Sequence, residues 1–192
     1  MKKNLTLISF ILVWVLLPRV SLAATDCNIQ TEIPATECHA LIALYDSTDG
    51  ANWKNKTGWK VTNTPCSWYE VTCGGGHVTG LYLYDNQLSG SIPVELGNLG
   101  NLTGLEIGSN QLSGTIPVEL GNLVKLIRLY LNNNQLSGTI PDLSSLTALV
   151  NTDLGYNKLT GETAGSATAK DSDWAATQTV PPHQSHGHGI IR

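Results

Sequence analysis

The sequence predicts an α/β solenoid, in which short coils stack and place a parallel β-sheet on one concave face. Three observations predict this fold class. A frame of about two dozen residues recurs, with Asn86, Asn110, Asn134 and Asn157 spaced 24, 24 and 23 residues apart. Leucines alternate ahead of these asparagines, and a Gly-x-Ile-Pro segment follows the first three of them. Self-similarity at such a period is typical of stacked repeats.

Each repeat begins with a predicted strand. Leu81 and Leu83 are two residues apart, so their side chains share one face of a short strand, and the residues between them face the other way. The same alternation recurs at Leu105 and Ile107, and at Leu129 and Leu131. Because one coil of 24 residues buries too little apolar surface to fold alone, neighbouring coils must stack and complete each other's core.

The end of each predicted strand is marked by one asparagine of the set Asn86, Asn110, Asn134 and Asn157. We expect these amides to be buried and to bond the backbone of the adjacent coil, which forms a ladder. In the Gly-x-Ile-Pro segment that follows, proline removes a donor and fixes φ. We therefore expect a turn there, with neither a long helix nor a continued strand.

The first 23 residues predict an export signal. Lys2 and Lys3 precede an apolar run over residues 5–17, Pro18 ends the run, and Ser21-Leu22-Ala23 supplies a cleavage site. A membrane anchor is the competing interpretation, but the run is shorter than the roughly 20 residues that a spanning helix needs. We expect cleavage after Ala23 and a secreted or extracellular chain, periplasmic or cell-surface if bacterial, without stable membrane insertion.

Export also decides how the four cysteines are interpreted, because disulfides persist outside the cytosol. Three pairings are open, and nearest-neighbour pairing is the simplest: Cys27 with Cys38, and Cys66 with Cys73. A zinc site is the alternative, which the wide spacings and the oxidising compartment disfavour.

The cysteines lie in a predicted cap that precedes the repeats. Cys38, Leu41, Ile42 and Tyr45 fall on one face of a helix that begins near Thr36 and ends before Gly50. The chain is thereby divided into a signal peptide (1–23), an N-terminal cap (24–76), about four coils (77–161) and a flexible tail (162–192) rich in small and polar residues.

The repeat resembles the 24-residue leucine-rich repeat of plant receptor ectodomains and of many bacterial secreted proteins. The second unit matches that pattern at Leu102, Leu105, Ile107, Asn110, Leu112, Gly114, Ile116, Pro117, Leu120 and Leu123. The segments CSWYEVTC and DGANWKNKTGW resemble the cysteine-bounded N-terminal cap of such proteins, including polygalacturonase inhibitors. The resemblance covers residues 37–161 and implies a right-handed coil that binds ligands.

The frame also predicts which side chains line the concave face. Tyr82, Glu106, Tyr130 and Asp153 fall in one column across adjacent parallel strands. Tyrosine offers amphipathic contact area at low entropic cost, which suits recognition of a peptide or a sugar ring. The alternative is that all of these are ordinary solvated strand residues. The full candidate set is Tyr82, Tyr84, Asp85, Glu106, Ser109, Arg128, Tyr130, Asn132, Asp153 and Tyr156.

Charge and side-chain chemistry exclude several function classes. Without residues 1–23 the chain holds 8 basic and 15 acidic side chains, a net charge of −7 that is unsuited to binding nucleic acid. His39 and His77 have no nucleophile partner in the frame, so we expect no enzyme, no cofactor and no dedicated metal site. The run at His183, His186 and His188 predicts adventitious metal binding only.

The predicted function is a secreted, non-enzymatic module that binds a protein, peptide or polysaccharide on its concave face. The alternative is a structural or oligomerising fragment of a larger repeat surface protein, which has no ligand of its own and forms a homodimer through its uncapped C-terminal end.

Overall fold

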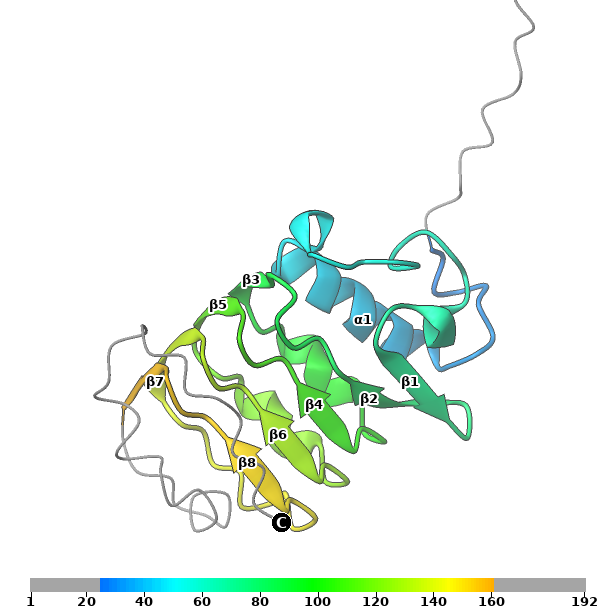
Figure 1. Ribbon diagram of the computed structural model, residues 1–192. Helices are drawn as coiled ribbons and strands as arrows, with labels where there is room; N and C mark the ends of the chain where they lie inside the picture. Colours follow the sequence, from blue (N-terminus) through cyan, green and yellow to red (C-terminus); the bar gives the residue numbers. More distant parts are fainter. Residues whose placement is uncertain (1–24, 161–192) are drawn as a thin grey trace, which may run out of the picture.

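The repeats stack as coils of a solenoid in the computed structural model, which describes residues 25–160 (Figure 1). The predicted signal peptide, the tail and its histidine run lie outside the described residues. The concave sheet has the order β1-β2-β4-β6-β8. Its strands are β1 (Val71–Gly74), β2 (His77–Leu81), β4 (Gly104–Glu106), β6 (Arg128–Tyr130) and β8 (Asn151–Asp153). The β1–β2 pair is antiparallel and all other pairs are parallel.

The register of this sheet follows the sequence period. Leu81 pairs with Leu105, Leu105 with Leu129, and Leu129 with Thr152. The three leucines are fully buried. Leu83, Ile107 and Leu131 lie just beyond the strands and are also fully buried, so the period-two alternation continues past the paired residues.

A second parallel sheet forms the next side of the coil and corrects the expectation of a simple turn. Its order is β3-β5-β7-β9, with β3 at Ser89–Ser91, β5 at Gln111–Gly114, β7 at Gln135–Thr139 and β9 at Lys158–Thr160. The first three strands run into the Gly-x part of the Gly-x-Ile-Pro segment, so the prediction that no strand forms there was wrong. The physical reason is that each neighbouring coil supplies backbone partners, and only Ile-Pro itself ends the pairing.

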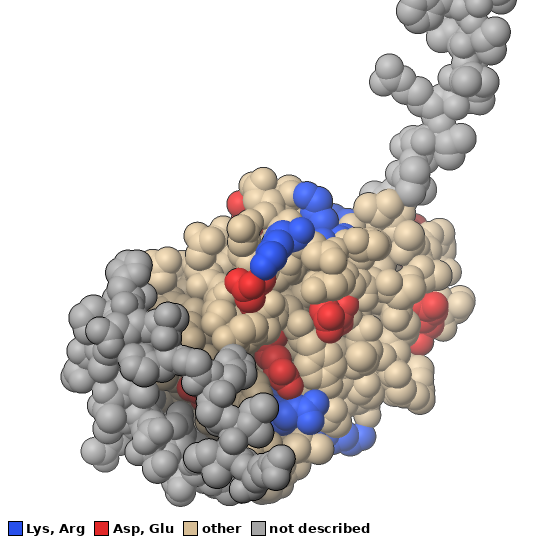
Figure 2. Space-filling view, viewed as in Figure 1, with Lys and Arg blue, Asp and Glu red and all other residues tan. Residues whose placement is uncertain are grey.

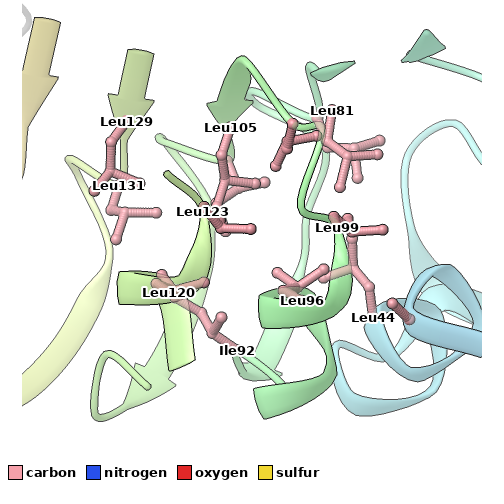
Figure 3. Close-up of a cluster of buried hydrophobic side chains, with 14 of the residues drawn as sticks. Leu44, Leu81, Ile92, Leu96, Leu99, Leu105, Leu120, Leu123, Leu129 and Leu131 are labelled. Carbon is pink, nitrogen blue, oxygen red and sulfur yellow. The ribbon is translucent and has the colours of Figure 1, made fainter. Parts of the chain in front are cut away.

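The third side of the coil carries short 3-10 helices, η3 (Val94–Asn98) and η4 (Val118–Asn122), each of which follows a proline. Proline cannot continue the sheet, but its fixed φ suits a helix start. Between these helices and the concave sheet lies the core (Figure 3). There Leu96, Leu99, Leu120 and Leu123 from the helical side meet Leu81, Leu105 and Leu129 from the strands.

The N-terminal end is covered by helix α1 (Ala35–Ser47), as the leucine spacing predicted. Cys38 and Leu41 are fully buried on its inner face, and Tyr45 packs at the edge of the core. Two disulfides hold the cap together, Cys27–Cys38 and Cys66–Cys73, with Cα separations of 5.5 and 5.6 Å. These are the nearest-neighbour pairs, and no free cysteine remains.

Three tryptophans complete the cap. Trp53, Trp59 and Trp68 are buried, with ring centroids 4.9 Å apart for the first pair and 5.1 Å for the second. Their indole N–H groups donate to Thr48 O, Tyr69 O and Thr62 Oγ1 respectively. The rings therefore serve packing, because each polar edge is satisfied inside the fold.

The cap helix is joined to the second sheet at its C-terminal end. The Ser89 N–H donates to Thr48 O at 3.0 Å, and Gly90 lies directly against the Ser47 carbonyl with φ at 112°. A side chain at Gly90 would collide with that carbonyl, so glycine permits the close approach. No helix within residues 25–160 combines the length and the apolar character required to cross a bilayer.

Candidate functional site

An asparagine ladder fixes the end of each concave strand. Oδ1 of Asn110 accepts hydrogen bonds from the Asn86 and Leu88 N–H groups, each at 3.0 Å. Its Nδ2 donates to Leu83 O at 2.9 Å and to Ile107 O at 3.0 Å. Asn134 and Asn157 repeat this pattern one coil further on.

The ladder differs from the expectation in burial. Asn86 and Asn157 are buried, whereas Asn110 and Asn134 are half-buried. The ladder also begins in the cap: Asn86 Nδ2 donates to Asn55 O at 2.9 Å, and its Oδ1 accepts the Asn55 N–H at 2.7 Å. Asn55 therefore takes the place of a missing preceding coil, a role with no signal in the repeat frame.

The residue before each ladder asparagine adopts a left-handed backbone conformation. The four φ angles are 49° at Asp85, 51° at Ser109, 53° at Asn133 and 55° at Tyr156. Aspartate and asparagine tolerate this region better than bulky residues do, so Tyr156 is the exceptional member. The turn directs these four side chains out of the strand direction, which separates them from the residues of the strands themselves.

The strand residues form the predicted column. Glu106 pairs with Tyr130 and Tyr130 with Asp153 in the parallel register. Tyr82 follows Leu81, whose partner Leu105 precedes Glu106, so Tyr82 is the first member of the same column. Neighbouring members lie on strands about 4.8 Å apart.

Arg128 links the first three coils across this face. Its Nε donates to Oε1 of Glu106 at 2.9 Å, and its Nη2 donates to the Tyr82 hydroxyl at 3.1 Å. The Glu106 hydrogen bond raises the pKa of Arg128 above its ordinary value, opposed by partial desolvation and aided by the Tyr82 contact. Gly104 allows this reach, because a Cβ there would lie 3.0 Å from the Tyr82 ring and 3.3 Å from Nη2.

A hollow of about 420 Å³ lies beside this network, and we call it the concave hollow. Gly108 contributes no side chain to it, and a Cβ there would lie 2.5 Å from Oδ1 of Asn132. The absent side chain leaves room between the flanking coils. The lining consists of Tyr84, Glu106, Tyr130, Asn132 and Asp153.

Comparison with known proteins places the repeat and the cap in established families. Residues 34–74 match the leucine rich repeat N-terminal domain. Residues 77–99, 101–123 and 125–146 each match the leucine rich repeat. The chain is a leucine-rich repeat protein.

Solved structures of similar proteins come from plants. In the PEPR1–AtPEP1 structure the matched chain is 34% identical, with a TM-score of 0.59, over 66% of this chain and 18% of that one. The ectodomain of the receptor kinase SOBIR1 from Arabidopsis thaliana is 30% identical, with a TM-score of 0.56, over 66% of this chain and 70% of that one. A plant ice-binding protein is 29% identical, with a TM-score of 0.60, over 67% and 42% respectively.

The leucine-rich repeat protein brings only part of its predicted binding set into the concave hollow. Tyr84, Glu106, Tyr130, Asn132 and Asp153 line the concave hollow, while Tyr82 and Arg128 form the network beside it. Asp85 instead forms an ion pair with Lys54 at 2.9 Å, and this hydrogen bond raises the pKa of Lys54. Ser109 and Tyr156 occupy left-handed positions outside the lining.

Charged groups are sparse on the face that carries this site. Figure 2 shows mostly uncharged atoms, with basic and acidic groups in contact at two places. Two printed ion pairs belong to the concave side, Lys54–Asp85 and Arg128–Glu106. Sequence reasoning missed Lys54, because it lies in the cap and no repeat position corresponds to it.

The histidines of the cap have structural surroundings. Nδ1 of His77 lies 2.6 Å from Oε1 of Glu37, and Oε2 of the same carboxylate accepts the Val78 N–H at 2.7 Å. This pair joins α1 to β2. Within the described part of the chain, no three His, Cys, Asp or Glu residues are grouped so that they could hold a metal ion.

Proposed function

We propose that this leucine-rich repeat protein is a secreted, non-enzymatic binding module that recognises a protein or peptide segment on its concave sheet. The concave hollow carries the proposal: two tyrosines, two carboxylates and an amide converge on about 420 Å³ of open space. These groups combine aromatic contact area with hydrogen-bonding capacity, as recognition sites do.

The rigidity of the scaffold supports this proposal. The lining residues come from three stacked coils whose strands are paired in register and whose ends are held by the asparagine ladder. Side chains presented on such a sheet lose little conformational freedom on binding, which favours affinity. The structure of PEPR1 with AtPEP1 shows a relative that forms a complex, and it supports a macromolecular partner here.

The shape of the concave hollow argues for binding rather than catalysis. It lies on an open sheet, where a reacting group would stay exposed to water. Its lining includes no histidine, serine, cysteine or lysine that could act as nucleophile or base. Glu106 and Asp153 are two strands apart, about 10 Å, with Tyr130 between them.

A random peptide library tests the proposal. Peptides selected on the secreted, disulfide-bonded protein should bind Tyr130→Ala at least about tenfold more weakly, because Tyr130 lines the concave hollow. Tyr156→Ala is the matched control, since this exposed tyrosine lies outside the lining. Peptides that lose nothing on Tyr130→Ala would contradict a concave binding site. Light scattering on the same samples distinguishes the structural alternative, which predicts a dimer that forms with rising concentration.

Ice binding is a second candidate, favoured by the likeness to a plant ice-binding protein. The second sheet is the surface to consider, because Ser and Thr recur along it. Two of its hydroxyls are engaged within the sheet, however: Ser113 Oγ donates to Gly90 O at 3.3 Å and Ser137 Oγ to Gly114 O at 3.4 Å. An ice-recrystallisation assay decides between the two, since a peptide-binding module should leave ice growth unchanged.

A further inference from the structure

We infer that the concave hollow selects a cationic side chain, lysine or arginine, of the bound segment. This inference deepens the proposed function and rests on it. Its starting point is the charge of the lining, in which Glu106 and Asp153 are acidic and no residue is basic. A ligand group entering this space meets carboxylates from two different coils.

The nearby arginine does not neutralise both acids. Arg128 is held by Glu106 through Nε and by Tyr82 through Nη2, and its guanidinium carbon lies 5.8 Å from the Tyr82 ring centroid. These contacts direct it toward the first coil. Asp153 lies on the opposite flank of Tyr130 from Glu106. The concave hollow therefore keeps a net negative charge after the Arg128–Glu106 pair is counted.

The Asp153 carboxylate is oriented by its own turn. Its Oδ1 accepts the Gly155 N–H at 2.9 Å, which fixes the side chain against the end of β8. A positioned carboxylate pays less ordering entropy when it binds a cation than a mobile one does. Asparagine at this position would keep the Oδ1 acceptor and lose the charge, so Asp153→Asn isolates the electrostatic contribution.

The aromatic and amide groups fit the same ligand. Tyr84 is exposed and Tyr130 half-buried, and both line the space. Their rings attract a cation placed over them, and they also pack along the methylene stem of lysine or arginine. Oδ1 of Asn132, which leans over Gly108, adds a neutral acceptor. An acidic side chain would find like charge here and no partner among the lining residues.

The test uses three short peptides that differ at one position: acetyl-Gly-Gly-X-Gly-Gly-amide with X as lysine, norleucine or glutamate. Each is titrated into the ¹⁵N-labelled, disulfide-bonded protein, and amide shifts are followed by NMR. We expect the lysine peptide to shift amides around Gly108, Asn132 and Asp153, and to bind at least about tenfold more tightly than norleucine. The glutamate peptide should shift none of them.

Two variant pairs make the test specific. Asp153→Asn should weaken the lysine peptide about tenfold, whereas Asp142→Asn, the same charge change at an exposed position outside the lining, should leave it unchanged. Gly108→Ala should abolish binding by filling the concave hollow, while Gly100→Ala, where an added Cβ meets nothing within 4 Å, should not. Each variant is checked for an unchanged spectrum away from the substitution.

Equal binding of the lysine and norleucine peptides would overturn the inference and leave the proposed function intact. The absence of concave shifts with the lysine peptide would overturn it as well, and the library selection then judges the proposed function separately. Concave shifts with a neutral oligosaccharide but with none of the peptides would contradict both and assign the site to a glycan.

Discussion

Arg128 and Glu106 lie on neighbouring coils, and Nε of Arg128 donates to Oε1 of Glu106 at 2.9 Å across the concave sheet. The pair is partly shielded, with side-chain exposures of 40% and 24%. It thus differs from the other ion pair of this face, Lys54–Asp85, whose side chains are 59% and 66% exposed. The shielded pair holds Glu106 at the edge of the concave hollow.

A double-mutant cycle over Arg128→Met and Glu106→Gln should give a coupling energy of about 0.5 to 1 kcal/mol at low salt. The partial shielding places the pair at the upper end of the range for surface ion pairs. The cycle is measured by urea unfolding, and the control is Lys54→Met with Asp85→Asn, where we expect a value near zero. A larger coupling for Lys54–Asp85 would contradict the role of shielding.

Asn110→Ala should destabilise the fold by about 1 to 3 kcal/mol, because it leaves the Asn86 and Leu88 N–H groups and the Leu83 carbonyl without their partner. Gln111→Ala, one residue on and exposed, should change stability by less than about 0.5 kcal/mol. Thermal unfolding of both variants checks the difference. If the two variants melt together, the ladder contributes nothing to stability.

Alanine should have opposite effects at two glycines. Gly90→Ala places a Cβ against the Ser47 carbonyl in a left-handed conformation, and should cost about 1 to 3 kcal/mol. Gly100→Ala meets open space and should be neutral or stabilising by about 0.5 kcal/mol, through a less flexible unfolded chain. Chemical denaturation of the two variants compares them. A stable Gly90→Ala protein would mean that the cap does not dock on β3 as described.

Thr152→Val should stabilise the protein by about 1 kcal/mol. The Thr152 hydroxyl is buried without a hydrogen-bond partner, at the position where the preceding coil places Leu129. Valine has nearly the same shape and removes an unsatisfied polar atom. Thr139→Val, on the exposed surface of the second sheet, is the matched control and should be near neutral. A loss of stability on Thr152→Val would show that the hydroxyl is satisfied in solution.

The repeat frame predicted the parts of the fold that depend on one position per coil. The leucine columns, the asparagine ladder and the Tyr82–Glu106–Tyr130–Asp153 column all follow from equal spacing, because a stacked coil places equivalent residues side by side. The cap helix could also be predicted, since its apolar residues repeat at helical spacing. The second sheet was missed because its strands, rich in serine and glycine, gain stability only from partners on adjacent coils.

The candidate site shows the same division. Spacing and residue type alone indicated that tyrosines and acids share the concave face. Only the folded chain reveals that Arg128 reaches over Gly104 to Tyr82, 46 positions earlier, and that Gly108 opens the concave hollow. It also reveals that Lys54 and Asn55 of the cap complete the first coil. A repeat period specifies which backbones are neighbours, whereas side-chain reach, missing Cβ atoms and contacts with the cap depend on distances that exist only after the coils have stacked.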